Sequence, residues 1–269
     1  TAGANVVWLP SEADPSILQE LRALDLWAAA TPPKAVDDNG VPLPAREVAM
    51  VPFPAATSPI LFWNLGTRIP PSAKDDVANW IEQVNNADRQ LSRPVMLDVS
   101  GLERVYSRLA PMLGVSRHML HTSLSAKDYR NWLIQQRKLA RPGSYVWTWI
   151  QTEAAPAHSD WRTDGQYHPV VVEPEQIRLQ TYAAIASACR GIAFWKTTRL
   201  DDDGPGSLER QLILTQLNLE LDLLGPWLAT GNVVTHVPFE INYRSAVNVS
   251  QRSLDFRTSE PELRERDAL

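Results

Sequence analysis

The chain has 269 residues, of which 44% are apolar and 21% charged, a composition typical of a globular protein and not of a disordered one. Its net charge of −5 argues against a nucleic-acid-binding protein. The single cysteine, Cys189, excludes an intrachain disulfide and a cysteine-based zinc site. No apolar run approaches the ~18 residues that a membrane span needs.

Short apolar, β-branched or aromatic runs alternate with helical patterns along the first part of the chain. In order, we predict a strand over 5–9, a helix over 15–23 and a strand over 26–30. Residues 34–58 are rich in Pro, Asp and Ala, and they predict no long element. A strand over 60–65, a helix over 73–86 and a strand over 94–99 follow.

The alternation continues to residue 228. We predict a short helix over 102–113, a strand over 118–122, and a helix that Ser125 caps and that runs to about residue 140. A strand over 145–152 and a helix over 175–189 come next. The last strand covers 191–195, and the last long helix covers 208–228.

Alternating strands and helices predict a parallel sheet, and near-continuous apolar strands are typical of sheets covered on both faces. No Gly-rich phosphate loop follows a strand, so a dinucleotide site is not indicated. We therefore predict an α/β fold, a (β/α)8 TIM barrel over residues 1–230 whose first strand lies upstream of Thr1. Residues 231–269 are expected to be a linker or the start of a further module of the same chain. An export signal would also lie upstream, so the sequence leaves the compartment open.

In a TIM barrel the active site lies at the carboxyl ends of the strands. Ten tryptophans are present, and several lie in or at the ends of predicted strands. Trp faces stack on sugar rings, and carboxylates and amides bind hydroxyls, so such a rim suits a carbohydrate. For Trp63, Trp147 and Trp149, packing in the core is the alternative. The candidate site residues are Trp63, Asn64, Asp98, His121, Gln151, Glu153, Trp195 and Lys196.

The stretches VWTWIQTE, ending at Glu153, and GIAFWKT, containing Trp195, resemble strands seven and eight of retaining glycoside hydrolases of clan A, which have (β/α)8 barrels. The resemblance implies that Glu153 is the nucleophile and that Trp195 lies beneath a sugar. In that family strand four ends in Asn followed by the acid/base Glu. The corresponding stretch here, LFWNLGT, has Asn64 followed by Leu65.

Leu65 cannot donate a proton, so another carboxylate must act as the acid or hydrolysis is lost. Asp98 ends the next strand and is the best substitute, because burial among apolar residues would shift its pKa. The alternatives are that Asp98 caps the following helix or bonds a neighbouring loop, and that Glu153 is a plain loop carboxylate. Two hypotheses follow: a glycoside hydrolase-like domain acting on oligo- or polysaccharide, with Asp98 and Glu153 catalytic, or a degenerate barrel that binds carbohydrate or serves as a scaffold.

The loop with His158, Asp160, Asp164 and His168 could in principle bind a metal, but its spacing matches no known metal site. A role at the rim of a substrate site is the better interpretation. We therefore expect no metal and no cofactor, and a carbohydrate as the partner.

Overall fold

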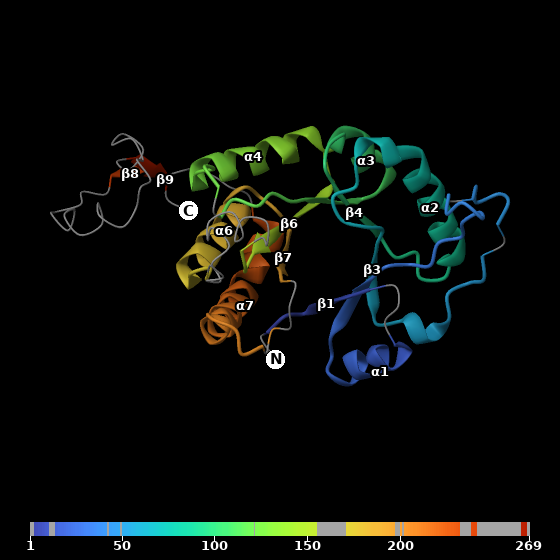
Figure 1. The fold of residues 1–269 in the computed structure, drawn as a ribbon, viewed down its shortest axis with the longest axis horizontal. Helices are drawn as coiled ribbons and strands as arrows, with labels where there is room; N and C mark the ends of the chain where they lie inside the picture. The colour runs from blue at the N-terminus through green and yellow to red at the C-terminus, as the bar shows by residue number, and fades with distance from the viewer. Residues whose placement is uncertain are drawn as a thin grey trace, which may run out of the picture.

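The computed structural model describes residues 3–10, 14–41, 43–48, 50–120, 122–154, 171–196, 200, 202–231, 238–240 and 265–267. Seven parallel strands form one curled sheet, and each strand pairs with its neighbours in the sequence (Figure 1). The sheet is an open half of a barrel. Its strands are β1 (Val6–Leu9), β2 (Trp27–Ala30), β3 (Ile60–Asn64), β4 (Val95–Val99), β5 (Met112–Val115), β6 (Tyr145–Gln151) and β7 (Gly191–Trp195).

Helices surround the strands in Figure 1, with α6 and α7 side by side. The ends of the helices follow ordinary capping chemistry, since the Asp14 carboxylate accepts from the Ser16 N–H at 2.8 Å and Ser125 caps α4 in the same way. The helices are α1 (Pro15–Ala23), α2 (Lys74–Ala87), α3 (Glu103–Leu109), α4 (Ala126–Leu139), α6 (Pro174–Ala186) and α7 (Ser207–Thr230), with short 3-10 turns η1 (Ala55–Thr57) and η2 (Pro71–Ala73).

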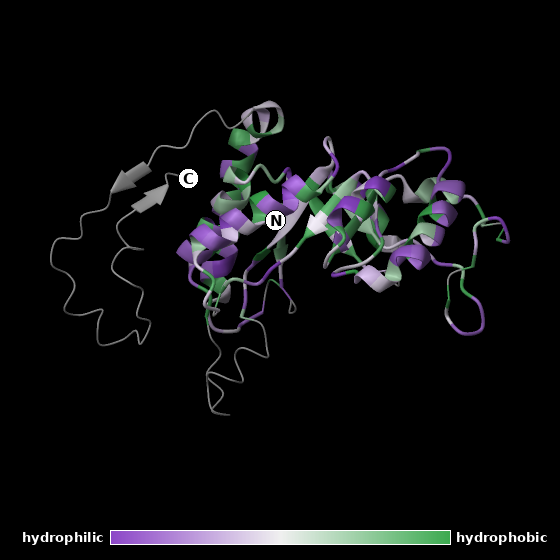
Figure 2. Ribbon diagram, turned by 90° about the horizontal axis from the view of Figure 1, so that it is seen from above, coloured by the Kyte–Doolittle hydropathy of each residue, from purple (hydrophilic) through white to green (hydrophobic). Residues whose placement is uncertain are grey.

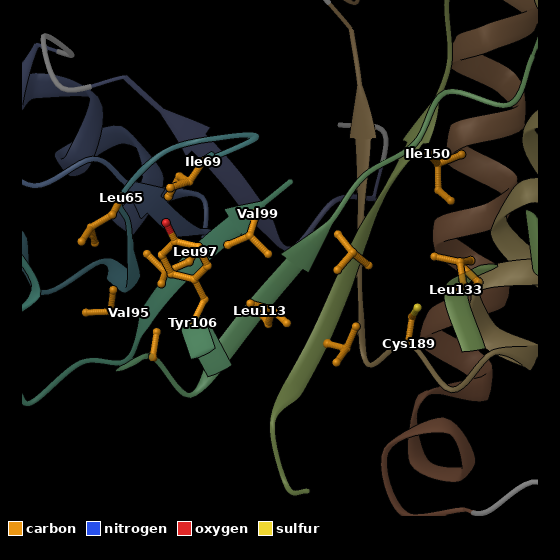
Figure 3. Close-up of a cluster of buried hydrophobic side chains, with 14 of the residues drawn as sticks. Leu65, Ile69, Val95, Leu97, Val99, Tyr106, Leu113, Leu133, Ile150 and Cys189 are labelled. Carbon is orange, nitrogen blue, oxygen red and sulfur yellow. The ribbon is translucent and has the colours of Figure 1, made fainter. Parts of the chain in front are cut away.

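Side chains alternate between the two faces of the sheet and form two hydrophobic cores. The inner core lies on the concave face, and its buried members are Ala29, Phe62, Met96 and Trp147. The larger outer core fills the space between the sheet and the helices. Figure 3 shows part of it, including Leu65, Leu97 and Leu113 from the strand side. In Figure 2 hydrophobic residues gather in the strands at the middle of the molecule.

Six of the seven predicted strands are confirmed, but the fifth was placed wrongly. Residues 118–122 do not form a strand; β5 covers Met112–Val115 and pairs with β4 and β6. The predicted helix over 102–113 is also too long, because Pro111 disfavours helical backbone at the residue before it. Ala110 is accordingly extended, and the chain enters β5 directly afterwards.

The eighth strand of a complete barrel is not seen among the described residues, so its place upstream remains a prediction. Beyond α7 the structure describes two short antiparallel strands, β8 (Pro238–Glu240) and β9 (Glu265–Asp267). Residues 232–237 and 241–264 lie outside the described residues, and the role of 231–269 also remains a prediction. No helix in the described part of the chain is both long and apolar enough to cross a membrane.

Candidate functional site

A pocket of about 110 Å³ opens at the carboxyl ends of the strands. Strand β6 contributes two of the lining residues, and β4 and β7 contribute one each. The loops after β3 and β5 supply the others. The position agrees with the general rule for barrels, in which loops at this end carry the chemistry. The lining residues are Thr67, Arg68, Asp98, Ser116, Arg117, His118, Trp149, Gln151 and Trp195.

Asp98 is the carboxylate of this pocket, and only 1% of the residue is exposed. Its Oδ2 atom accepts from the Arg68 backbone N–H at 3.1 Å and from the Ser116 hydroxyl at 3.2 Å. Arg68 reaches this position with a left-handed backbone, φ +52°, in the loop after β3. Loops after two different strands therefore fix one carboxylate oxygen, and the side chain has a single defined orientation.

The neighbour of Asp98 on β5 is Gly114, which pairs with it in register. A Cβ atom at Gly114 would lie 2.8 Å from the Asp98 Cβ and 2.9 Å from its Cα, closer than real Cβ contacts allow. Glycine is therefore needed here for close packing and not for a special turn. The absence of a side chain at Gly114 leaves space for the Asp98 side chain on the concave face.

Burial raises the pKa of Asp98 to about 6, although the hydrogen bonds from Arg68 and Ser116, the Trp149 indole and the positive charge of Arg68 lower it. The Trp149 N–H is close enough to act on Asp98 but makes no hydrogen bond of good geometry. Asp98 can thus be protonated near neutral pH, as a general acid must be.

Three buried polar atoms at the pocket have no hydrogen-bond partner among the described residues: Asp98 Oδ1, Trp149 Nε1 and Gln151 Nε2. The other amide atom of Gln151 is fixed, because Oε1 accepts from the Leu120 N–H at 3.1 Å. Buried polar groups are nearly always satisfied, so three such atoms around one pocket indicate a place for a polar ligand. Asp98 Oδ1 can accept a hydrogen bond or carry a proton, and Trp149 Nε1 and Gln151 Nε2 can each donate one.

Aromatic rings form the walls. Trp149 stands edge-on to Trp8 with ring centroids 4.8 Å apart, so β1 and β6 meet across the concave face. Trp195 is held edge-on by His118 at 4.9 Å. Each indole is thereby supported from one side and lines the pocket with its other surfaces.

Glu153 lies just beyond β6 but is not part of the pocket lining. Its Oε2 is 3.6 Å from the Lys196 ammonium, which also binds Asp202 at 2.7 Å. Lys196 directly follows Trp195 at the end of β7, so this ion-pair group lies on the same rim. The structure therefore brings Glu153 and Lys196 together beside the pocket, while Asp98, Gln151 and Trp195 line it.

Trp63 was expected at the substrate site, and the structure corrects this. Its side chain points into the outer core, where Nε1 donates to the buried Asp88 at 3.0 Å and the Arg93 guanidinium lies 4.5 Å over the ring. A bulge at Leu61 shifts the pairing of β3 with β2. After the bulge, the Phe62 side chain lies in the inner core and the Trp63 side chain lies in the outer core.

Asn64 and Leu65 also differ from expectation. Asn64 is 2% exposed, accepts from the Gly66 N–H at 3.2 Å and does not line the pocket. Leu65 is buried in the outer core with Ile69 and Leu97 (Figure 3). The position after Asn64 therefore points away from the pocket, because side chains alternate along the strand.

His121 and the loop with His158, Asp160, Asp164 and His168 lie outside the described residues. Thr122, expected at the end of the fifth strand, instead lies in the loop after β5. Within the described ranges, no group of three or more His, Cys, Asp or Glu side chains is arranged to hold a metal ion.

Sequence reasoning missed several lining residues. Ser116, Arg117 and His118 follow β5, and the misplaced strand concealed them; Pro111 was the signal that would have corrected it. Arg68 follows β3, in a loop whose path no strand or helix pattern indicates. Trp149 was left open between core and site.

No family model matches this sequence, and no curated protein matches it. Among solved structures, the chain is similar to a β-glucuronidase from an uncultured Clostridium sp., with 12% identity and a TM-score of 0.45. The alignment covers 80% of this chain and 45% of that one, so this chain spans less than half the length of that enzyme. Similarity of this extent assigns neither an activity nor a substrate.

We predict that Asp98 destabilises the protein above neutral pH. Because its folded pKa is raised from 3.8 to about 6, its contribution to stability is greatest below pH 4 and is lost as the pH rises through 6. Two pKa units correspond to about 3 kcal/mol. Asp98→Asn should therefore be more stable than wild type at pH 8, and the difference in the free energy of unfolding between the two proteins should be smaller at pH 4.5.

Urea unfolding at both pH values measures this difference. Asp222→Asn, on the exposed side of α7, is the control for loss of one carboxylate. If Asp98→Asn is less stable than wild type by the same amount at pH 8 and at pH 4.5, the Asp98 carboxylate stabilises the fold and the prediction is wrong.

Proposed function

We propose that this chain is a glycoside hydrolase-like domain that binds an oligo- or polysaccharide at the carboxyl ends of its strands, with Asp98 as the proton donor. The observation that carries the proposal is a pocket lined by two indole rings, at which Asp98, Trp149 and Gln151 each have a buried polar atom with no hydrogen-bond partner among the described residues. Sugar rings combine apolar faces with hydroxyl groups that donate and accept, which is the chemistry that these walls would complement.

Glu153 is the proposed second carboxylate. It stands on the same rim, and Lys196 holds it with an ion pair of 3.6 Å. Retaining hydrolysis needs a pair of carboxyl groups about 5–5.5 Å apart, and inverting hydrolysis needs a wider pair. In this proposal Asp98 protonates the leaving oxygen, while Glu153 attacks the sugar or activates a water.

A second candidate is a barrel that binds a saccharide without cleaving it. The observation that favours it is the pairing of Glu153 with Lys196 outside the lining, which leaves Asp98 as the sole carboxylate among the described lining residues. In this case the polar atoms would bind hydroxyl groups, and there would be no second carboxylate to complete the chemistry.

The charge of Glu153 separates the two candidates. For a hydrolase, Glu153→Gln should lower kcat/KM by at least about 100-fold and leave saccharide binding in place, because the amide keeps the shape and removes the nucleophilic or basic charge. Turnover of an aryl glycoside panel and calorimetric titration of the same sugars measure both effects.

Glu175→Gln, exposed in the first turn of α6, is the matched control. Calorimetric binding by a wild-type protein that turns over none of the panel would support the binding barrel. Unchanged kcat/KM in a folded Glu153→Gln variant would remove Glu153 from the chemistry.

A further inference from the structure

The described residues that line the pocket include more cations than carboxylates, although the whole chain has a net charge of −5. Arg68 and Arg117 both line it, from the loops after β3 and β5. Both residues are exposed, so they stand at the mouth, while Asp98 is buried behind them. Among the described lining residues, two permanent cations thus stand beside one acidic group that is partly protonated near neutral pH.

The guanidinium groups of Arg68 and Arg117 are less engaged than those of some other described arginines. Arg93 pairs with Asp88 at 2.5 Å, and Arg178 pairs with Glu220 at 2.7 Å. By contrast, no side-chain hydrogen bond or ion pair of Arg68 or Arg117 occurs within the described part of the chain. Arg117 lies 5.7 Å from the centre of the Trp132 ring. That cation–π contact orients the guanidinium and leaves its N–H edge available.

We infer that the saccharide bound in this pocket carries an acidic group, a carboxylate or a sulfate, which Arg68 and Arg117 recognise. The inference rests on the proposed saccharide-binding function and names the class of its ligand. A planar guanidinium offers parallel N–H donors that match two oxygens of such a group, and charge-assisted hydrogen bonds are stronger than neutral ones. Trp149, Trp195 and Gln151 would then hold the sugar ring beneath.

The test begins with an array of defined glycans that are neutral, uronic acid-containing or sulfated. The strongest acidic glycan is then titrated calorimetrically beside its neutral counterpart, which is the methyl ester for a carboxylate and the desulfated sugar for a sulfate. We expect the acidic form to bind about 10-fold more tightly, and this preference to weaken as salt rises. Comparing the uronic acid-containing glycans with the sulfated glycans shows whether a carboxylate or a sulfate is the preferred acidic group.

Arg68→Gln and Arg117→Gln should each remove most of this preference, and affinity for the neutral sugar should change little. Arg108→Gln, exposed on α3 and outside the pocket, is the matched control for loss of one positive charge. Thermal unfolding of each variant confirms its fold.

Equal or tighter binding of neutral glycans would overturn the acidic ligand and leave the saccharide-binding function in place. A preference that survives in the double arginine variant would equally overturn the recognition by Arg68 and Arg117. Binding to no glycan on the array would overturn the proposed function and this inference together.

Discussion

Asp98→Asn is expected to lower kcat/KM on glycosides with poor leaving groups by about 10²–10⁴-fold, which is the usual contribution of general acid catalysis. Activated aryl glycosides, whose leaving groups need no proton, should lose much less. The reason lies in the pocket, where Asp98 is buried, has a pKa of about 6, and has one oxygen without a hydrogen-bond partner among the described residues. Kinetics on matched alkyl and nitrophenyl glycosides measure the difference.

The pH profile gives an independent readout. A general acid works when protonated, so wild-type kcat/KM should fall as the pH rises above 6, and the Asn variant should lack this limb. Ser116→Ala is an informative second variant, because the Ser116 hydroxyl donates to Asp98 and lowers its pKa. Its removal should move the alkaline limb to higher pH. Equal losses on both substrate types in Asp98→Asn would exclude the acid role.

The strand order could be predicted from the sequence because buried parallel strands are continuous apolar runs with helices between them. β6 and β7 were recognised in this way, and Gln151 and Trp195 at their ends line the pocket. The fifth strand was missed because MLGV is short and contains Gly114. That glycine is needed where it packs against Asp98, so the feature that weakens the strand pattern is the one that shapes the site.

The face of the sheet on which a side chain lies was less predictable from the sequence than the positions of the strands. Phe62 and Trp63 are both apolar, so the sequence does not show which of them faces the concave side. The bulge at Leu61 comes from pairing with β2, which is a long-range property. The same holds for Arg68 and Ser116, because each reaches Asp98 from a loop whose path is fixed by the tertiary structure.

Gly191→Ala is expected to destabilise the fold by about 3 kcal/mol, at the upper end of ordinary overpacking. Gly191 begins β7 and pairs in register with Trp147 of β6. An added Cβ would lie 1.7 Å from Cε3 of the Trp147 ring, which lies across the glycine. Trp147 is 8% exposed and packs edge-on against Phe62 at 5.2 Å, so the ring has little room to move aside.

Urea unfolding of four proteins locates the strain: wild type, Gly191→Ala, Trp147→Leu and the double variant. If the Trp147 ring is the obstacle, Gly191→Ala should cost clearly less in the Trp147→Leu background, with a coupling energy above about 1 kcal/mol. Gly225→Ala is the control, because apart from its chain neighbours and the adjacent helix backbone no atom lies within 4 Å of an added Cβ. It should change the free energy of unfolding by less than about 1 kcal/mol. An equal cost of Gly191→Ala in both backgrounds would place the strain elsewhere in β7 and not at the inner-core tryptophan beneath the pocket.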